Sequence, residues 1–456
     1  MLRKLLVVLL SLTALSGIYA NGSQDSGHSN NMVKGEKIDL TVESGQIELD
    51  VFLPFGSDFH NGRLTDFKAA NPNISIREVE IAGNFDTKLI TMAAAGNAPD
   101  VFVMGPQNIL TFIRHGVLLP LDDYFESSEV VKRTDLLPIN EEVFGWSEDG
   151  FGEGSIYGFA SGWSPDLFMY YNRDLFDKAG VEYPSSDKPM TWSQFRAMLQ
   201  KLGEKDSSGN WLTYPTVFDF VPIQHLYSYI LSNGGSVYTK DGGTCVVADD
   251  SRTREAIQAW MDMQIGPDAV IPYFEDPIPQ QSSQMFQSGR MAVAFGGSWA
   301  VKQYWDKAPG LNWGYAPTPV ADNGGENVAM VAGMIGQVIS ARTRYPNAAW
   351  KLFEYLLTED QQWVAESGMA MPIRRNYLSE MGSDPTLNDH MKSFVKFLGR
   401  EAETARLFPR SPYIPDTAVD TIFRDNLREV YFGNMNLDAA LQKIQTEVNT
   451  EIGDWK

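Results

Sequence analysis

Residues 47–104 decide the fold: they read IELDVFLPFGSDFHNGRLTDFKAANPNISIREVEIAGNFDTKLITMAAAGNAPDVFVM. Patterns typical of strands alternate here with patterns typical of helices, and Asn, Pro and Gly separate them. The strand patterns occupy 47–52, 74–79 and 100–104, and the helix patterns occupy 64–69 and 85–95. This alternation predicts an α/β fold in which a mostly parallel sheet is flanked by helices.

Ligands of such sheets bind beyond the carboxyl ends of the strands. This rule nominates the loops 54–58 and 105–107, and with them Phe55, Ser57 and Gln107 as ligand contacts.

The same alternation continues beyond Gly150. We expect a strand over 167–171 and a helix over 173–179. Thr191 then stands three residues before Gln194, which is the spacing of a capping box at the start of a helix that runs to Leu202.

The first residues predict export. Arg3 and Lys4 precede an apolar run over 5–15, and Ile18-Tyr19-Ala20 fits a cleavage site, so residues 1–20 read as a signal peptide. Residues 21–39 are rich in Ser, Asn and Gly, which predicts a flexible tether. No cysteine stands directly after the predicted cleavage site, where the residues are Asn21-Gly22-Ser23-Gln24, so we expect a free periplasmic protein and not a lipoprotein.

Charge and cysteine content narrow the class of protein further. The formal net charge of −21 argues against nucleic acid as a partner. The single cysteine, Cys245, cannot form an internal disulfide, and without a basic neighbour in sequence it is expected to be buried and inert. A chain of 456 residues exceeds what one hydrophobic core usually supports, so two lobes are expected.

Four segments, taken in order, resemble the sugar-type family of extracellular solute-binding proteins, which includes maltose-binding protein. They are 67–104, then 156–180 (IYGFASGWSPDLFMYYNRDLFDKAG), 286–299 (FQSGRMAVAFGGSW), and 331–374 with PNAAWKLFEYLLTEDQQ and the closing MPIRR. Each motif is weak alone, and their order carries the resemblance.

The resemblance implies a two-lobed periplasmic binding protein fold in which closure of the lobes traps a ligand. The expected N-terminal lobe is 40–160 with 312–366, and the expected C-terminal lobe is 161–311 with 367–456. Hinges are then expected near Ser161, Gly310 and Ser367.

The family also implies the function: a monomer without a cofactor that captures a carbohydrate and delivers it to the permease and ATPase of an ABC importer. The first loops lack the charged residues and the Trp found there in maltose-binding protein, so maltose itself is not the expected ligand.

A sugar needs aromatic rings for its apolar faces and fixed polar groups for its hydroxyls. Trp299, after Gly296-Gly297-Ser298, is expected to stack on the ligand, with a core position as the alternative. Trp163 is a second candidate of this kind. Candidate polar or loop contacts are Asp219, Arg374, Asp166 and Gly333. A solvated loop acid remains an alternative for Asp219, and a salt bridge within the fold remains one for Arg374.

Other functions stay open at this point. A related binding protein could take an acidic sugar, a polyol, a peptide or iron, and a sensor could present the closed lobes to a receptor. Tyr170-Tyr171 resembles the tyrosine pair of iron binders, but alternation on a strand sends the two side chains to opposite faces. An exported glycoside hydrolase is the enzymatic alternative, although no pair of acids and no zinc motif among the five histidines supports one.

Overall fold

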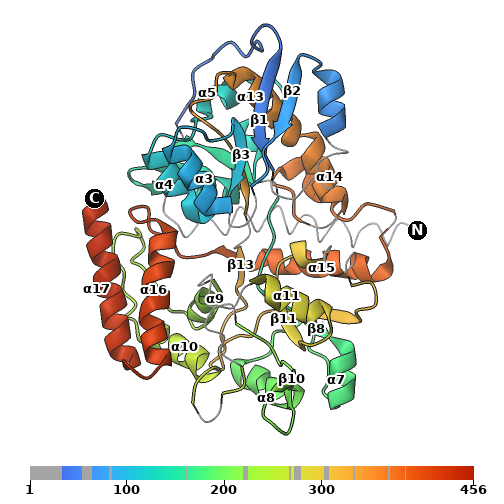
Figure 1. Cartoon of the computed structure of the whole chain (residues 1–456), viewed down its shortest axis with the longest axis vertical. Helices are drawn as coiled ribbons and strands as arrows, with labels where there is room; N and C mark the ends of the chain where they lie inside the picture. The colour runs from blue at the N-terminus through green and yellow to red at the C-terminus, as the bar shows by residue number, and fades with distance from the viewer. Residues whose placement is uncertain are drawn as a thin grey trace. The chain divides into compact units, whose positions relative to one another are not determined.

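The structure is a computed structural model. It describes residues 33–53, 64–81, 85–160, 162–218, 224–266, 269–271, 279–301, 304, 308–331, 334–367, 370–385 and 387–456. The chain divides into two compact units, which Figure 1 colours by residue number. Unit 1 comprises residues up to Trp163 and Met334–Leu387, and unit 2 comprises Ser164–Gly333 and Asn388–Lys456.

Unit 1 is built around a five-stranded sheet in the order β2-β1-β3-β14-β7. Its strands are β1 (Ile47–Phe52), β2 (Ile74–Glu78), β3 (Val101–Met104), β7 (Gly158–Ala160) and β14 (Gly336–Ile339). β1 runs parallel to β2 and β3, whereas β14 runs antiparallel to β3 and β7. The sheet is therefore mixed.

Helices and short elements complete unit 1. A helix covers 64–70, and the others are α3 (Phe85–Ala94), α4 (Ile109–Arg114), α5 (Asp122–Ser127), α6 (Pro138–Phe144), α13 (Pro346–Leu356) and α14 (Glu359–Ser367). Three turns are 3-10 helices: η1 (Pro106–Asn108), η2 (Arg133–Asp135) and η3 (Arg375–Glu380). A small antiparallel sheet consists of β4 (Gly145–Ser147), β5 (Gly150–Phe151) and β6 (Ser155–Ile156).

Unit 2 has a three-stranded sheet in the order β11-β8-β12. Both neighbours run antiparallel to the central strand. The strands are β8 (Phe168–Asn172), β11 (Val293–Gly296) and β12 (Trp313–Ala316). Two further pairs are antiparallel β9 (Glu204–Lys205) with β10 (Trp211–Thr213), and parallel β13 (Ala329–Val331) with β15 (Ala405–Leu407).

The helices of unit 2 surround a core rich in aromatic and long aliphatic side chains. They are α7 (Arg173–Ala179), α8 (Trp192–Leu202), α9 (Gln224–Ser232), α10 (Ser251–Asp262), α11 (Pro279–Gln287), α15 (Asp389–Glu403), α16 (Asp416–Tyr431) and α17 (Leu437–Trp455). The last two pack against each other, as Figure 1 shows.

The α/β prediction is confirmed. A mostly parallel sheet is present in unit 1, where β1, β2, β3 and β7 run in one direction, but it is wrong for the described three-stranded sheet of unit 2, which is antiparallel. In unit 2 the chain leaves β8, passes through several helices and returns at β11 in the opposite direction. In unit 1 the late strand β14 enters antiparallel between β3 and β7. A parallel neighbour requires a right-handed crossover, whereas a strand that returns after a long connection can also pair in the antiparallel direction.

Several local predictions are confirmed. The helix expected over 173–179 is α7, and the strand expected over 47–52 is β1. Thr191 and Gln194 form the capping box: each backbone N–H donates to the other side chain, at 2.9 Å and 3.3 Å. Because these signals are local, they could be read without knowledge of the fold.

The two units do not follow the expected lobe boundaries. Residues 312–333 fall in unit 2 because β12 pairs with β8, with Tyr315 opposite Tyr170. Residues 367–387 fall in unit 1, where Ile373 accepts a backbone hydrogen bond from Leu137 at 2.8 Å. The chain passes between the units after Trp163, Gly333 and Leu387. The first of these passages lies close to the hinge expected at Ser161, whereas Gly310 and Ser367 do not coincide with a passage.

The expected signal peptide at 1–20 and most of the expected tether lie outside the described residues. The last part of that tether is bound to unit 1. The backbone of Val33 donates to Gly154 at 3.2 Å, Glu36 donates to the Asp123 carboxylate at 2.8 Å, and Ile38 donates to the Ser127 hydroxyl at 2.8 Å. A flexible tether up to residue 39 is therefore wrong for residues 33–39.

Within the described residues, no helix has the length and apolar character needed to span a bilayer. Cys245 is fully buried in unit 2, as expected, and burial raises the pKa of its thiol to about 11.

Candidate ligand-binding site

The candidate site in unit 2 is built on the loop that follows β11. Gly296 ends this strand. Gly297 and Ser298 follow it, and Trp299 lies at the start of a helical turn. The Trp299 side chain is 49% exposed, so the core alternative for this residue is wrong. Its ring lies beside Gly296, where an added Cβ would come within 3.7 Å of Cζ2. The loop therefore presents a flat aromatic surface to its surroundings.

Glycine at position 297 allows the loop to approach Asp166. A Cβ at Gly297 would lie 1.5 Å from Asp166 Oδ1 and 2.7 Å from Ser164 Oγ. The Tyr170 hydroxyl donates to the Gly297 carbonyl at 2.7 Å and fixes the loop from the sheet side. Any larger residue at 297 would displace the loop that carries Trp299.

Asp166 supports this loop from below. Its side chain is buried and accepts a hydrogen bond from Ser164 Oγ, and the Ser298 backbone donates to the same hydroxyl at 3.4 Å. The Asp166 backbone donates to the Met330 carbonyl at 2.6 Å. The sequence nominated Asp166 for its loop position, and the structure connects it to the Trp299 loop through the Ser164 hydroxyl.

The two adjacent tyrosines of β8 point to opposite faces of the sheet, as predicted. Tyr170 packs against Tyr304, with ring centroids 5.1 Å apart, whereas Tyr171 packs against Phe176 at 5.2 Å. Burial raises the pKa of Tyr170 well above its ordinary value, with smaller contributions from Tyr304 and Asp166. The pair does not converge on one point, as two tyrosine ligands of a metal would.

Two candidates in unit 1, Trp163 and Arg374, are buried within that unit. Trp163 is 1% exposed, and its backbone exchanges hydrogen bonds of 3.0 Å and 2.7 Å with Met371. Arg374 donates to the Leu357 carbonyl at 3.1 Å and pairs with the Asp135 carboxylate at 3.5 Å. Of the two interpretations of Arg374, the structure favours the salt bridge within the fold.

Gln107 lies in η1, directly after β3, and is partly buried. Its side chain folds back over Gly105, where an added Cβ would lie 2.3 Å from the amide. The remaining candidates, Phe55, Ser57, Asp219 and Gly333, lie outside the described residues. In unit 2 the structure thus brings Asp166 and Trp299 together, and in unit 1 it places Trp163 near the segment that carries Arg374.

Sequence reasoning missed the residues that hold the Trp299 loop in place. The Ser164 hydroxyl donates to Asp166, and the Tyr170 hydroxyl donates to the Gly297 carbonyl. Gly297 leaves the space that the Asp166 side chain occupies. The double glycine was the one local signal for the close approach. Across the described ranges, no group of three or more His, Cys, Asp or Glu side chains is arranged to hold a metal ion.

Comparison with known proteins finds a matching family. The family model for bacterial extracellular solute-binding proteins matches residues 59–363. A maltodextrin-binding protein of Bacillus subtilis is 27% identical over 371 residues, which are 78% of this chain and 76% of that protein.

Two solved structures are also similar. One is an ABC substrate-binding protein from Listeria monocytogenes in complex with cycloalternan, with a TM-score of 0.75, 21% identity, and coverage of 90% of this chain and 99% of that one. The other is a maltose/maltodextrin-binding domain from Bdellovibrio bacteriovorus bound to maltotriose, with a TM-score of 0.72, 18% identity, and coverage of 89% and 100%. Both are binding proteins, and their likeness to this chain is one of fold.

Proposed function

Because the chain belongs to the family of bacterial extracellular solute-binding proteins, we propose that it captures a carbohydrate for an ABC importer and delivers it to the membrane permease. The observation that carries the proposal is the exposed Trp299 ring on a loop that buried groups hold from beneath. A flat ring fixed in this way suits the apolar C–H face of a sugar, and it loses little side-chain entropy on binding.

The relatives support an oligosaccharide as the ligand class. The similar Listeria protein holds cycloalternan, the Bdellovibrio domain holds maltotriose, and the Bacillus relative is a maltodextrin-binding protein. We propose that Trp299 stacks on one sugar ring and that Asp166 positions the Trp299 loop. Gln107, Phe55, Ser57, Asp219 and Gly333 remain candidate contacts of the same ligand, whereas the burial of Trp163 and Arg374 supports structural roles for these two residues.

Capture requires that the two units respond to the ligand. A ligand that binds both units shifts a population of open molecules toward closed ones. We propose that the three passages of the chain between the units act as the hinges of this motion. The receptor is proposed to act as a monomer, with the permease and its ATPase as partners.

Family membership implies a periplasmic or secreted location. We propose the periplasm, reached through a cleaved signal peptide over 1–20 and without a lipid anchor. We also propose that the protein has no enzymatic activity, since its family and the similar proteins described above are binding proteins.

A thermal-shift screen tests this function. The purified chain is heated with maltotriose, cycloalternan, monosaccharides, uronates, polyols, peptides and ferric citrate. A ligand at about 100 times its dissociation constant should add about 2.7 kcal/mol of stability. We expect a shift with an oligosaccharide, and chromatography of the incubated sugar should show no product.

Three outcomes would contradict the proposal. A shift with peptides or iron alone would assign another cargo. Turnover of the sugar would assign a hydrolase. A lipid-modified N-terminus in the mass spectrum of the exported protein would contradict the proposed free periplasmic form.

A further inference from the structure

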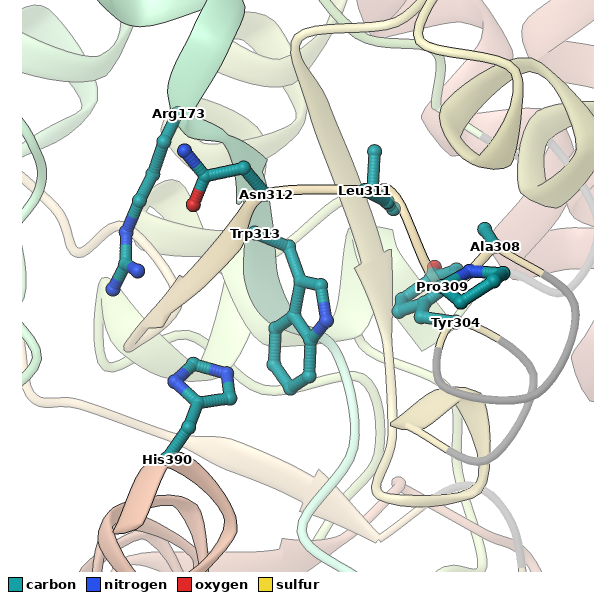
Figure 2. Close-up of a pocket in the computed structure, with 8 residues that line it drawn as sticks. All are labelled: Arg173, Tyr304, Ala308, Pro309, Leu311, Asn312, Trp313 and His390. Atoms are coloured by element: carbon teal, nitrogen blue, oxygen red, sulfur yellow. The ribbon is translucent and has the colours of Figure 1, made fainter. Parts of the chain in front are cut away.

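A cavity opens in unit 2 at the opposite end of β8 from the Trp299 loop. Its volume is about 430 Å³, and Figure 2 shows the residues that line it. Arg173 directly follows the last residue of β8, and Asp166 precedes its first residue by two. Five strand residues at about 3.3 Å each separate the two ends by roughly 16 Å. The cavity is therefore distinct from the candidate carbohydrate site.

Arg173 gives the cavity its charge. It is the one Lys, Arg, Asp or Glu among the lining residues that the structure describes. Its Nε is buried without a hydrogen-bond partner, and no carboxylate of the described chain pairs with it. The nearest acid in sequence, Asp174, accepts a hydrogen bond from Asn312 at 2.8 Å instead.

Arg133 in unit 1, whose side chain is buried, shows the contrasting arrangement. Two carboxylates neutralise it, Asp122 at 2.7 Å and Glu141 at 2.6 Å. Arg173 is only partly buried and its guanidinium lies 5.9 Å from the Tyr183 ring centroid, so its charge is not neutralised by a carboxylate and is available to an anion in the cavity. In a chain with a net charge of −21, an acid-free pocket around Arg173 is suited to an anion.

His390 adds a second polar group, near the start of α15. Its ring stands edge-on to Trp313, with centroids 4.3 Å apart and planes at 80°. Its Nε2 is buried and has no partner in the described structure. Burial and the neighbouring Arg173 lower the pKa of His390, so the imidazole is neutral at pH 7 and can donate one hydrogen bond. Figure 2 shows His390 and the Arg173 guanidinium on the same side of the Trp313 ring.

Apart from Asn312, whose amide donates to Asp174, the rest of the wall is mainly apolar. Trp313 and Tyr304 are nearly fully buried, with ring centroids 6.2 Å apart, and Ala308 and Leu311 continue the surface. Pockets of this size and character hold small molecules that have an apolar body and one or two polar groups. The ligand therefore needs a ring or other compact apolar body as well as its negative charge.

We propose that this cavity is a second binding site, for a small organic carboxylate with a ring body. The Arg173 guanidinium pairs with the carboxylate, His390 donates a further hydrogen bond, and Trp313 and Leu311 contact the ring. The proposal goes beyond carbohydrate capture and stands whether or not the Trp299 loop binds a sugar.

Titration of the full chain with 4-fluorobenzoate, followed by fluorine NMR, tests the site. We expect saturable binding that 4-fluorobenzyl alcohol, of the same shape without charge, shows at least tenfold more weakly. Arg173→Gln should weaken 4-fluorobenzoate binding at least tenfold. Arg406→Gln, which removes an exposed arginine of unit 2 on β15, is the matched control and should leave it unchanged.

Two further variants keep the test decisive if Arg173→Gln folds poorly. Ala308→Leu fills the cavity without a change of charge and should also weaken binding at least tenfold. Trp299→Ala should leave 4-fluorobenzoate binding unchanged, which separates this site from the carbohydrate site. Absence of binding to the wild-type chain, equal binding of the uncharged alcohol, or unchanged affinity in Ala308→Leu would overturn the proposal.

Discussion

Trp163 in unit 1 and Trp299 in unit 2 are the two tryptophans that local sequence context nominates for ligand contact, and the structure treats them in opposite ways. Trp163 is 1% exposed and Trp299 is 49% exposed. Around Trp163 the backbone is tied to Met371, whereas beneath Trp299 the bonded groups are Ser164, Asp166 and Tyr170. Exposure of the ring, combined with bonded groups under its loop, is what separates the proposed binding residue Trp299 from Trp163, and residue type or an adjacent glycine does not separate them.

The largest effect is expected from Trp163→Ala. Removal of a fully buried tryptophan typically lowers the free energy of unfolding by about 3–5 kcal/mol. Urea denaturation followed by circular dichroism measures the loss, and Trp163→Phe should lose less because it leaves a smaller cavity. A loss below about 1 kcal/mol would show that the Trp163 ring contributes no packing and would break the comparison.

The burial of Glu401 on α15 predicts that the stability of unit 2 depends on pH. This side chain is 4% exposed, and Asn327 Nδ2 donates to its two oxygens at 3.3 Å and 3.2 Å. Burial raises the pKa of Glu401 from 4.5 to about 7. The folded state thus holds the proton more tightly than the unfolded state, so the associated stability is complete below about pH 4.5 and is lost as pH rises through about 7.

Glu401→Gln should remove this loss, which amounts to about 3 kcal/mol at most. The new amide can also donate to Asn327 Oδ1, which is buried without a partner in the described structure. Hydrogen exchange of unit 2 peptides between pH 5 and 8, corrected for intrinsic rates, measures the effect. Glu403→Gln, at an exposed position of the same helix, is the control, and an identical pH profile for all three proteins would refute the assignment.

Arg374→Gln should produce a smaller loss of stability. The substitution breaks the bond to the Leu357 carbonyl and the ion pair with Asp135, which together contribute about 1–3 kcal/mol. If Arg374 is structural, calorimetry on the folded variant will give a carbohydrate affinity within twofold of wild type. A tenfold weaker affinity with unchanged stability would return Arg374 to the binding site and weaken the contrast between the units.

Trp299→Ala should have the smallest effect on folding, within about 0.5 kcal/mol, because exposed substitutions rarely cost more. Carbohydrate affinity should fall at least tenfold, which corresponds to about 1.4 kcal/mol. Thermal unfolding and calorimetry on the same sample separate the two quantities, and Trp299→Phe should recover part of the affinity. A folded Trp299→Ala protein that binds as tightly as wild type would remove the stacking role.

Elements with local signals could be predicted from the sequence. The Thr191–Gln194 capping box and helix α7 lie where their residues predicted them, because caps and periodicity depend on neighbours within a few positions. The resemblance to a family extended these elements to a fold. The direction of β11 and β12 beside β8 could not be predicted, since partners more than a hundred residues away decide it.

The candidate site was predictable only in part, for a related reason. The glycines before Trp299 indicated a close backbone approach, but no local pattern showed that Asp166 occupies that space. Nor could a pattern distinguish the buried Trp163 from the exposed Trp299. Arg173 and His390 lie in one cavity although most of unit 2 separates them in sequence, so their proximity is a property of the fold alone.

The buried Cys245 gives the chain a built-in probe of local opening in unit 2. Its backbone exchanges hydrogen bonds of 2.7 Å and 3.0 Å with Asn449 on α17, and no other cysteine competes for a thiol reagent. Because the thiol is sealed and its pKa is near 11, a reagent reacts only while this part of unit 2 is open. The labelling rate therefore counts the openings of that packing directly, without an engineered probe. Any ligand that stabilises unit 2 will lower the rate at which Cys245 is labelled.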